Sequence, residues 1–341
     1  MSSGNAAIAN PVRVGLIGAG RIGSSHAEIL HRRVPGAELV AVADAMPESA
    51  RKLAATLGVR ADPDPQTLIG DDSIEAVVIA ASTPAHADLV VAAAQAGKGV
   101  FCEKPMALSL DDATRAVDAA QAAGVVLQVG FNRRFSPDFA AARRAIDDGL
   151  VGTPQLMRSL TRDPGLANPA GVAPGTIFLL TLIHDFDTLL WLNPGAEAVE
   201  VFVMADALVA PDYKGAGLLD TAIVSIRFDN GALATAEASF SASYGYDVRG
   251  EVFGSAGMVS AGDTSRTSMQ LLTSAGQSRE TVRGDVELFG AAYTAEFVEF
   301  VDAVREQRES SVTGRDAKRA LAIALACIES ARTGAPAKVS S

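Results

Sequence analysis

The spacing of apolar residues changes near residue 131 and predicts a different architecture on each side. Up to that point, short apolar runs alternate with segments of helical periodicity. Since strands separated by such helices form parallel sheets with right-handed crossovers, we expect a doubly wound Rossmann domain over residues 11–131. Its strands are expected at 12–17, 38–44, 74–81, 99–103 and 125–131, with a short one near Val59, and its helices at 24–32, 47–57, 85–96 and 110–123.

Beyond residue 131, strand-like segments with alternating faces follow one another, as is typical of antiparallel sheets. We expect an α+β domain over 132–335, built on a large, mostly antiparallel open sheet, with the late helices packing back toward the first domain. The strands are expected at 155–162, 199–208, 220–228, 232–241, 248–253, 258–260 and 268–273, and the helices at 137–147, 177–191, 293–307 and 314–332.

One face of this second sheet consists of small residues, among them Ala234, Ala236 and Ala238. A broad face of this kind needs a cover. We therefore expect a homo-oligomer, either a dimer or a homotetramer, with a subunit interface on the C-terminal sheet.

A glycine-rich turn, GAGRIG at 18–23, joins the first strand to the first helix. In such turns the first glycine permits the bend, the second lets the backbone approach a pyrophosphate, and the third allows close packing. The alternative is a turn with only a structural role. The cofactor-binding residues predicted here are Gly18, Gly20, Arg21, Ile22 and Gly23.

Asp44 ends the second strand, about 20 residues beyond the glycines, where a carboxylate binds the ribose of a dinucleotide. Ala45 and Met46 follow it, so no arginine is adjacent to receive a 2′-phosphate. This pattern favours NAD over NADP.

The loop Ser82-Thr83-Pro84-Ala85-His86 follows a strand at the carboxyl edge of the sheet, where ligands bind in such folds. We predict cofactor contacts from Ser82, Thr83 and His86. A proline at the first position also makes the segment a good helix start, which is a purely structural alternative. His86 itself is interpreted as a cofactor neighbour or a helix-surface residue, rather than as a catalytic base.

Glu103-Lys104-Pro105 ends another strand at the same edge, so we predict cofactor contacts from Glu103 and Lys104, with Lys104 pointing toward the nicotinamide end of a dinucleotide. An ammonium group titrates at about 10.4 and acts near neutrality if burial or a nearby positive ring lowers its pKa. The alternative is a surface lysine before a turn.

The segment 177–191 is apolar nearly all round and predicts a buried helix, whose few polar residues must have partners. At helical spacing His184 and Asp187 share a stripe with Leu180 and Trp191. His184 is a candidate acid or base with Asp187 as its supporting carboxylate, and the alternative is a satisfied core histidine.

Composition excludes several classes of protein. The 341 residues suffice for two domains, and the net charge of −11 argues against nucleic-acid binding. No apolar run is long enough to span a membrane and no signal peptide is evident, so we expect a cytoplasmic protein. Cys102 and Cys327 are too few for a disulfide framework or a zinc site, and no metal is expected.

Several motifs in order resemble the glucose-fructose oxidoreductase/inositol dehydrogenase family (Gfo/Idh/MocA), and within it the likeness to inositol 2-dehydrogenases and related sugar dehydrogenases is strongest. The resemblance implies that Lys104 is the catalytic lysine of the EKP motif and that His184 exchanges the hydroxyl proton. It also places Arg133, Tyr244 and Tyr293 near the substrate. The matching stretches are GLIGAGRIG, VADA, ASTPAHADLV, CEKPMALS, VGFNRRFSPDF, LIHDFDTLLWL, SYGYDVRGEVFGSAG and AAYTAEFVEFVDAV.

Two departures from the family pattern concern the substrate. Polyol dehydrogenases of the family usually carry Asp-x-x-x-His on the second-domain helix, and Leu180 stands at the first of these positions. Asp163, another candidate substrate-binding residue, lies in a segment, TRDP, where inositol enzymes often show His-x-Asn-Pro. The resemblance therefore implies a sugar, a glycoside or a differently substituted polyol with an apolar patch opposite Leu180, rather than myo-inositol.

These observations predict an NAD-dependent dehydrogenase that oxidises a secondary alcohol of a cyclic polyol, sugar or glycoside to a ketone by hydride transfer. Two alternatives remain open. One is a ketosugar reductase or an aldose oxidoreductase with tightly bound cofactor, and the other is a dinucleotide-binding sensor or scaffold without catalysis.

Overall fold

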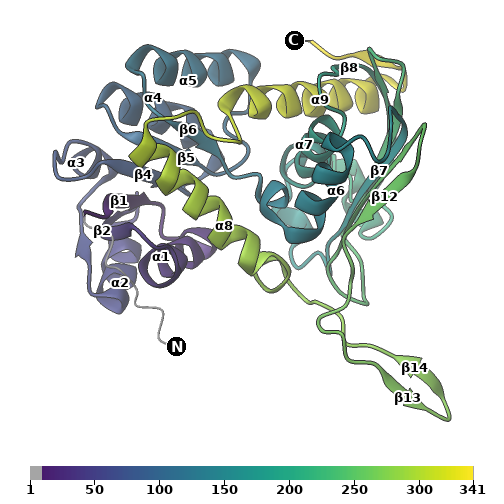
Figure 1. Cartoon of the computed structure of the whole chain (residues 1–341), viewed down its shortest axis with the longest axis horizontal. Helices are drawn as coiled ribbons and strands as arrows, with labels where there is room; N and C mark the ends of the chain where they lie inside the picture. Colours follow the sequence, from purple (N-terminus) through teal and green to yellow (C-terminus); the bar gives the residue numbers. More distant parts are fainter. Residues whose placement is uncertain (1–9, 341) are drawn as a thin grey trace. The chain divides into compact units, whose positions relative to one another are not determined.

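The computed structural model describes residues 10–340, which fold into two compact units (Figure 1). The first unit contains the residues up to Phe131 together with Tyr293–Lys318. The second contains Asn132–Ala292 and the residues from Arg319 onward.

A six-stranded parallel sheet forms the centre of the first unit, in the order β3-β2-β1-β4-β5-β6. The order reverses between β1 and β4, as it does in doubly wound sheets, so the predicted Rossmann architecture is confirmed. The interior strands are apolar and almost fully buried because helices cover both faces. The strands are β1 (Val12–Ile17), β2 (Ala37–Ala43), β3 (Arg60–Ala61), β4 (Ala76–Ile79), β5 (Gly99–Cys102) and β6 (Leu127–Val129).

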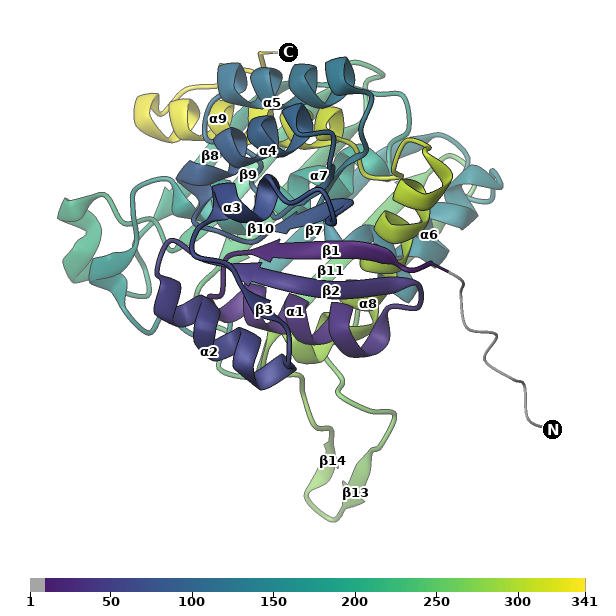
Figure 2. The ribbon, with the colours of Figure 1, turned by 90° about the vertical axis from the view of Figure 1, so that its left-hand side faces the viewer.

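Helices α1 and α2 lie on one face of this sheet, and α4 and α5 on the other (Figure 2). The sequence did not predict α3, although Asp64 caps it by accepting the Thr67 N–H at 2.8 Å and Pro65 begins it. The first helix starts three residues earlier than expected, directly after Gly20. The helices are α1 (Arg21–Arg33), α2 (Pro47–Leu57), α3 (Pro65–Ile69), α4 (His86–Gln95) and α5 (Leu110–Ala123), with a 3₁₀ turn, η1 (Thr83–Ala85), before α4.

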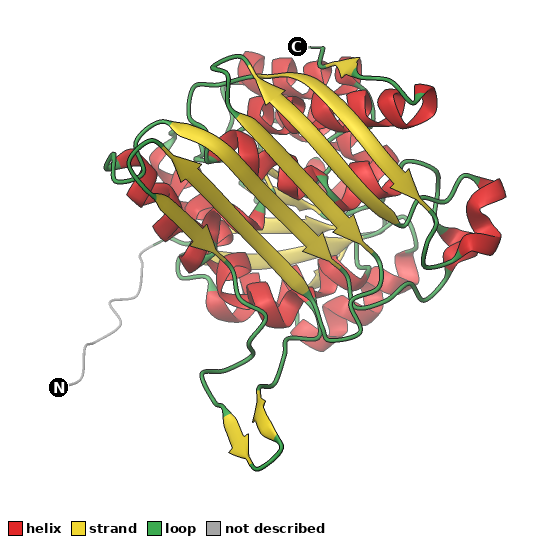
Figure 3. Ribbon diagram, turned by 90° about the vertical axis from the view of Figure 1, so that its right-hand side faces the viewer, coloured by secondary structure: helices red, strands yellow, loops and turns green. Residues whose placement is uncertain are grey.

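A seven-stranded sheet dominates the second unit, in the order β12-β11-β7-β10-β9-β8-β15 (Figure 3). Only β10 and β7 pair in parallel, and the other neighbours are antiparallel, as the alternating pattern predicted. A separate hairpin joins β13 (Leu271–Thr273) to β14 (Gly276–Ser278). The sheet strands are β7 (Pro154–Arg162), β8 (Ala198–Asp206), β9 (Thr221–Phe228), β10 (Leu233–Ser239), β11 (Asp247–Gly254), β12 (Met258–Ala261) and β15 (Ala337–Lys338).

The expected helix over 177–191 is two elements: a π-helical turn, η4 (Ile177–Thr181), and then α7 (Ile183–Trp191). A capping box begins the last helix, since the Asp316 N–H donates to the Thr313 hydroxyl and the Thr313 N–H donates to the Asp316 carboxylate. The remaining helices are α6 (Pro137–Asp147), α8 (Asp285–Glu306) and α9 (Gly314–Thr333), with short 3₁₀ turns η2 (Asn132–Phe135), η3 (Pro169–Gly171) and η5 (Pro211–Ala216).

The alanine face of this sheet is covered within the chain and needs no second subunit as its cover. Ala234, Ala236 and Ala238 are buried within the chain because α7 packs on β7 and β10. The prediction that this face needs a subunit as its cover is therefore wrong. The opposite face is the one left open by the helices of the unit (Figure 3).

Both cysteines, Cys102 and Cys327, are free and buried. Burial raises the pKa of each thiol, which makes both groups poorly nucleophilic. Across residues 10–340, no helix combines the length and apolar character that a bilayer crossing requires. The same residues contain no cluster of three or more histidine, cysteine or acidic side chains suited to a metal ion.

Candidate active site

The glycine turn is closed on its protein side and open where a ligand would approach. A Cβ at Gly18, whose φ is +106°, would lie 2.4 Å from the carbonyl of Ala80, and one at Gly23 would lie 1.9 Å from the Gly18 oxygen. A Cβ at Gly20 would meet nothing within 4 Å. These are the three roles of a dinucleotide-binding turn, and α1 begins directly behind Gly20, as a helix does in phosphate-binding turns.

Asp44 lies against this turn. Its Oδ2 accepts the Ala19 N–H at 2.6 Å and its Oδ1 accepts the Met46 N–H at 2.7 Å. Each carboxylate oxygen retains capacity for another hydrogen bond, so the group is held in place and can still bind ribose hydroxyls. Arg21 and Ile22 are the first two residues of α1 beside it.

Ser82 precedes the 3₁₀ turn that leads into α4, and Thr83 is the first residue of that turn. His86 opens α4 and is 1% exposed, so it is not a helix-surface residue. Its Nδ1 lies 2.8 Å from the oxygen of Pro105 and its Nε2 lies 3.0 Å from the oxygen of Ala81. His86 therefore connects the two predicted cofactor loops.

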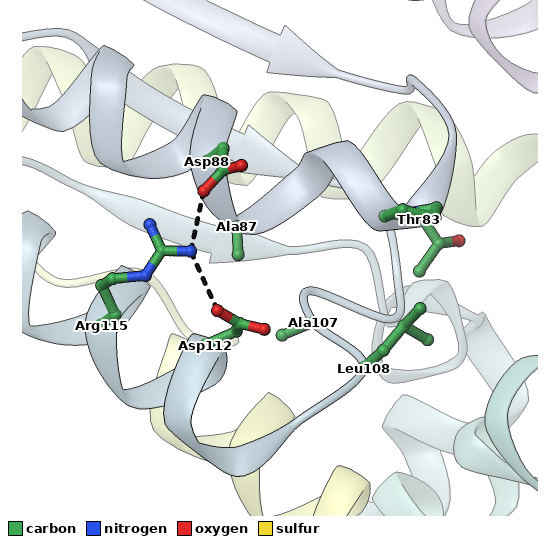
Figure 4. A pocket seen from close by; sticks show the side chains of 8 residues that line it. Thr83, Ala87, Asp88, Ala107, Leu108, Asp112 and Arg115 are labelled. Carbon is green, nitrogen blue, oxygen red and sulfur yellow. Dashed lines mark hydrogen bonds and ion pairs between the residues drawn. The ribbon is translucent and has the colours of Figure 1, made fainter.

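Thr83 also lines a cavity of about 210 Å³ on the first unit (Figure 4). Across it, Arg115 of α5 donates to Asp88 at 2.8 Å and to Asp112 at 2.9 Å. These three charged side chains are solvent-accessible and neutralise one another only in part. The other lining residues are Pro84, Ala87, Ala107 and Leu108.

Glu103 and Lys104 follow β5, and the carboxylate of Glu103 is turned into the protein. Its Oε1 lies 2.6 Å from Nε2 of His26, and its Oε2 accepts the Lys104 N–H at 3.1 Å. Burial opposes ionisation of Glu103, but the hydrogen bond and charge of His26, with Lys104 and His86, keep its pKa below the ordinary value. Glu103 thus fixes the backbone from which the half-buried Lys104 side chain extends.

The sequence did not single out His26 or Glu296, which lie in the buried surroundings of Glu103. The His26 ring meets Phe297 at 4.9 Å and Tyr293 at 5.5 Å, both edge to face. Burial, followed by the charge of Glu103, raises the pKa of the fully buried Glu296 well above its ordinary value. Tyr293, predicted near the substrate, is 7% exposed and packs on His26 in the first unit.

In the second unit, His184 is the second residue of α7, and its carbonyl accepts the Thr188 hydroxyl at 2.7 Å. Asp187 forms a bidentate ion pair with Arg134, with contacts of 2.9 Å to Nε and 2.5 Å to Nη2. Asp187 is 1% exposed, so the pair anchors α7 from inside the unit.

Arg133, predicted near the substrate, belongs to a buried polar network. It donates to Asp185 at 2.8 Å and to Thr161 at 2.5 Å. Asp185 also accepts the hydroxyls of Ser159 at 2.5 Å and Thr161 at 2.7 Å. The sequence pattern did not single out Asp185, although the requirement that polar residues of a buried helix have partners applies to it as well.

The remaining predicted substrate residues occupy different surroundings. Leu180 lies in the π-helical turn and is 38% exposed. The Tyr244 hydroxyl donates to Asp247 at 2.6 Å, and the Asp163 N–H donates to the carbonyl of Ser239. Tyr246, which the sequence did not indicate, faces Asp163: burial and then that negative charge raise the pKa of its phenol.

Two family models match this chain. Residues 12–131 match the NAD-binding Rossmann fold of the GFO/IDH/MocA oxidoreductases, and residues 143–339 match the C-terminal alpha/beta domain of the same family. The chain belongs to the GFO/IDH/MocA oxidoreductase family. It is therefore an oxidoreductase with an NAD-binding domain, and the open cradle at Gly20 beside Asp44 fits that cofactor.

Relatives match over nearly the whole chain. Myo-inositol 2-dehydrogenase of Thermotoga maritima is 38% identical over 94% of this chain and 96% of its own length. The NAD(+)-dependent scyllo-inositol 2-dehydrogenase of Bacillus subtilis is 37% identical over 96% of each. Among solved structures, myo-inositol dehydrogenase from Lactobacillus casei in complex with NAD(H) and myo-inositol has a TM-score of 0.90 at 27% identity, covering 97% of both chains.

Proposed function

We propose that this protein is an NAD-dependent dehydrogenase that oxidises a secondary alcohol of a cyclic polyol, sugar or glycoside to a ketone. The observation that carries the proposal is the extent of the match: inositol dehydrogenases align with both domains, over at least 94% of the chain. The cradle at Gly20 supports it independently, since the geometry there suits a pyrophosphate.

NAD, when bound, supplies the acceptor for the hydride that leaves the carbinol carbon. Gly18, Gly20 and Gly23 would receive its pyrophosphate, Asp44 its ribose, and the loop at Thr83 would complete the site. Since the Asp44 carboxylate would repel a 2′-phosphate, NADP is disfavoured. We place the reaction in the cytoplasm, because both cysteines are free thiols, as in proteins of reducing compartments.

Lys104 and His184 have different roles at the substrate hydroxyl. His184 accepts the hydroxyl proton as the carbonyl forms, because imidazole changes charge near neutral pH. Lys104 donates a hydrogen bond to the same oxygen and stabilises the negative charge that develops there. Asp187 supports His184 by fixing α7 through its ion pair with Arg134.

Leu180 sets the expected substrate apart from myo-inositol. Its side chain is 38% exposed and offers neither a hydrogen-bond acceptor nor a charge. A ring that presents an apolar patch at this point, as in a glycoside or a differently substituted polyol, loses no hydrogen bond there. Other proposed substrate contacts come from Arg133, Asp163, Tyr244 and Tyr293.

We also propose assembly into a homo-oligomer through the open face of the seven-stranded sheet. Large apolar residues are exposed as adjacent pairs on this face, with Ile223 (50% exposed) opposite Met204 of β8 and Phe253 (50% exposed) opposite Leu156 of β7. Contiguous exposed apolar side chains mark interaction surfaces in soluble proteins. Light scattering should give the mass of a dimer or tetramer and a smaller mass for Ile223→Asp, whereas a monomeric parent protein would contradict this assembly.

The function is tested by incubating the protein with NAD and a panel of inositols, monosaccharides and glycosides, and following NADH absorbance. We expect turnover with at least one ring bearing a secondary hydroxyl, a preference for NAD over NADP, and no turnover by Lys104→Ala. Absence of turnover across the panel with both cofactors would overturn the proposal, and near-parental rates of Lys104→Ala would remove the lysine from the mechanism.

A further inference from the structure

His86 makes two hydrogen bonds that a neutral imidazole cannot make together. Its two ring nitrogens reach the main-chain oxygens of Pro105 and Ala81, at 2.8 Å and 3.0 Å. Both partners are carbonyl groups, which accept hydrogen bonds and cannot donate them. A neutral ring has one N–H, so its other nitrogen would direct a lone pair at a carbonyl oxygen. With 1% of the residue exposed, water has little room to relieve that repulsion.

We propose that His86 is held as an imidazolium with two N–H groups, and that it acts as a brace between two loops that positions Lys104. The proposal rests on the proposed role of Lys104 in the dehydrogenase reaction. His86 is a positioning residue in this scheme, since it acts through the backbone of the lysine segment.

The brace joins the ends of two neighbouring strands. β4 and β5 run parallel with Ile79 opposite Cys102, and the braced carbonyls lie shortly beyond, in the loops that follow. Pro105 is the residue directly after Lys104. The Ala81 nitrogen would be 2.6 Å from a Cβ at Gly18, so the loop that contains Ala81 packs directly against the glycine turn. One ring therefore connects the lysine segment to the backbone that supports the cofactor cradle.

The charges around His86 favour a positive ring. Glu103, buried beside it after β5, has a pKa below its ordinary value; burial opposes this shift, and His26, Lys104 and His86 together outweigh that effect. The positive neighbour is Lys104, whose segment the brace holds. On α4 itself, Asp88 is 76% exposed at its side chain and pairs with Arg115 of α5, which also binds Asp112. A buried cation is tolerated when it is hydrogen-bonded and near an opposite charge, and both conditions hold here.

The protonation state can be read directly in the parent protein. The chain has four histidines, so nitrogen-15 labelling of histidine gives a small set of ring signals, and the set lost in His86→Gln assigns the residue. Near neutral pH, we expect both His86 nitrogens to resonate as protonated imidazolium nitrogens. A lone-pair nitrogen in this residue would overturn the proposal. The measurement needs no substrate, so it stands even if the proposed function fails.

The positioning role is tested by kinetics of His86→Gln and His86→Ala on the substrate found in the panel. We expect kcat to fall roughly 10- to 100-fold, with the dissociation constant of NADH changing less than about threefold, because misplacement of a catalytic group costs rate rather than cofactor affinity. Glutamine should retain more activity than alanine, since it keeps one donor. His31→Gln, an exposed histidine of α1, is the matched control and should match the parent.

Two results would overturn the positioning role: kcat within about twofold of the parent, or a loss of cofactor affinity equal to the loss of rate. If Lys104→Ala keeps near-parental rates instead, the proposed mechanism fails, and the labelled spectrum still decides whether His86 carries two protons.

Discussion

The glycine turn of the first unit and helix α7 of the second both present polar groups, but they hold them differently. In the turn, the groups belong to the main chain, and Gly23 packs against Gly18 only five residues away. In α7, the groups are side chains fixed by distant residues, as Arg133 of η2 fixes Asp185. The first arrangement depends on a few consecutive residues, whereas the second exists only once the whole unit has folded.

The largest expected effect is a loss of kcat on replacing His184 of α7, with cofactor binding at the glycine turn unchanged. His184→Asn should lower kcat by about 10²–10⁴, the usual contribution of a general acid or base. The dissociation constant of NADH, measured by fluorescence titration, should stay near the parental value because the turn is unchanged. Equal weakening of cofactor binding would show that the two regions are not separable in this way.

The next largest effect is a loss of stability on breaking the buried network of Arg133 and Asp185. Arg133→Met leaves Asp185 buried without its cation, and breaking a buried pair costs about 3–5 kcal/mol. Urea unfolding should show this loss, with Arg144→Met, an exposed arginine of α6, as the control. The double variant Arg133→Met/Asp185→Leu should regain part of the stability. A loss no larger than that of the control would mean that the network does not support α7.

Two glycines test the locally formed region. Gly23→Ala places a methyl group against the Gly18 carbonyl, so the backbone must shift at a cost of about 1–3 kcal/mol in thermal or denaturant unfolding. Gly20→Ala adds its methyl to open space and should leave the Tm unchanged, while the NADH dissociation constant rises roughly tenfold, about 1.4 kcal/mol. A lowered Tm for Gly20→Ala, together with an unchanged Tm for Gly23→Ala, would contradict this packing.

The same contrast explains how much the sequence could predict. The glycine turn, Asp44 and the alternation of strands with helices in a parallel sheet follow from local spacing, and the structure shows them as expected. The ion pairs of Arg133 and Arg134 join elements 52 and 53 residues apart, which no periodicity encodes. The same holds for His26 and Glu103, which pair across 77 residues.

The alanine face shows a second limit of sequence patterns. The period of two correctly gave the two faces of the sheet, yet it could not say that α7 covers the face of Ala236. The π-helical turn also lay beyond the pattern, because a continuous apolar run has the same appearance in an α-helix and in a π turn followed by one.

A smaller effect, on kcat/KM for myo-inositol, is expected on replacing Leu180. Leu180→Asp changes a partly exposed side chain, so stability should stay within about 0.5 kcal/mol of the parent. The new acceptor should raise kcat/KM for myo-inositol by about 2- to 10-fold, the worth of one hydrogen bond. Leu150→Asp, at a more exposed leucine, is the control and should leave kcat/KM unchanged. No gain, or a gain in both variants, would remove Leu180 from substrate selection.

The smallest expected effect is a change in Tm on replacing Glu296 in the first unit. The pKa of Glu296 is raised in the folded protein, so folding favours its protonated form. Its destabilising effect therefore grows as the pH rises above the ordinary value of 4.5 toward the folded-state pKa. Glu296→Gln removes this penalty and should raise the Tm near neutral pH, by about 2–4 °C for each kcal/mol.

The gain from Glu296→Gln should shrink as the pH falls toward 4.5. Glu28→Gln, at an exposed position of α1, should show no such pH dependence. An unchanged or lowered Tm of Glu296→Gln at neutral pH would mean that the buried acid is stabilised there in its ionised form.

Because Cys102 and Cys327 are both buried, thiol-directed labels should not react with the native chain. A single replacement, Ser274→Cys in the exposed turn between β13 and β14, would then provide one addressable site for a fluorophore. Mixing donor- and acceptor-labelled chains would convert any association between copies of the chain into an energy-transfer signal, so the proposed assembly could be tested in solution without altering either the glycine turn or α7.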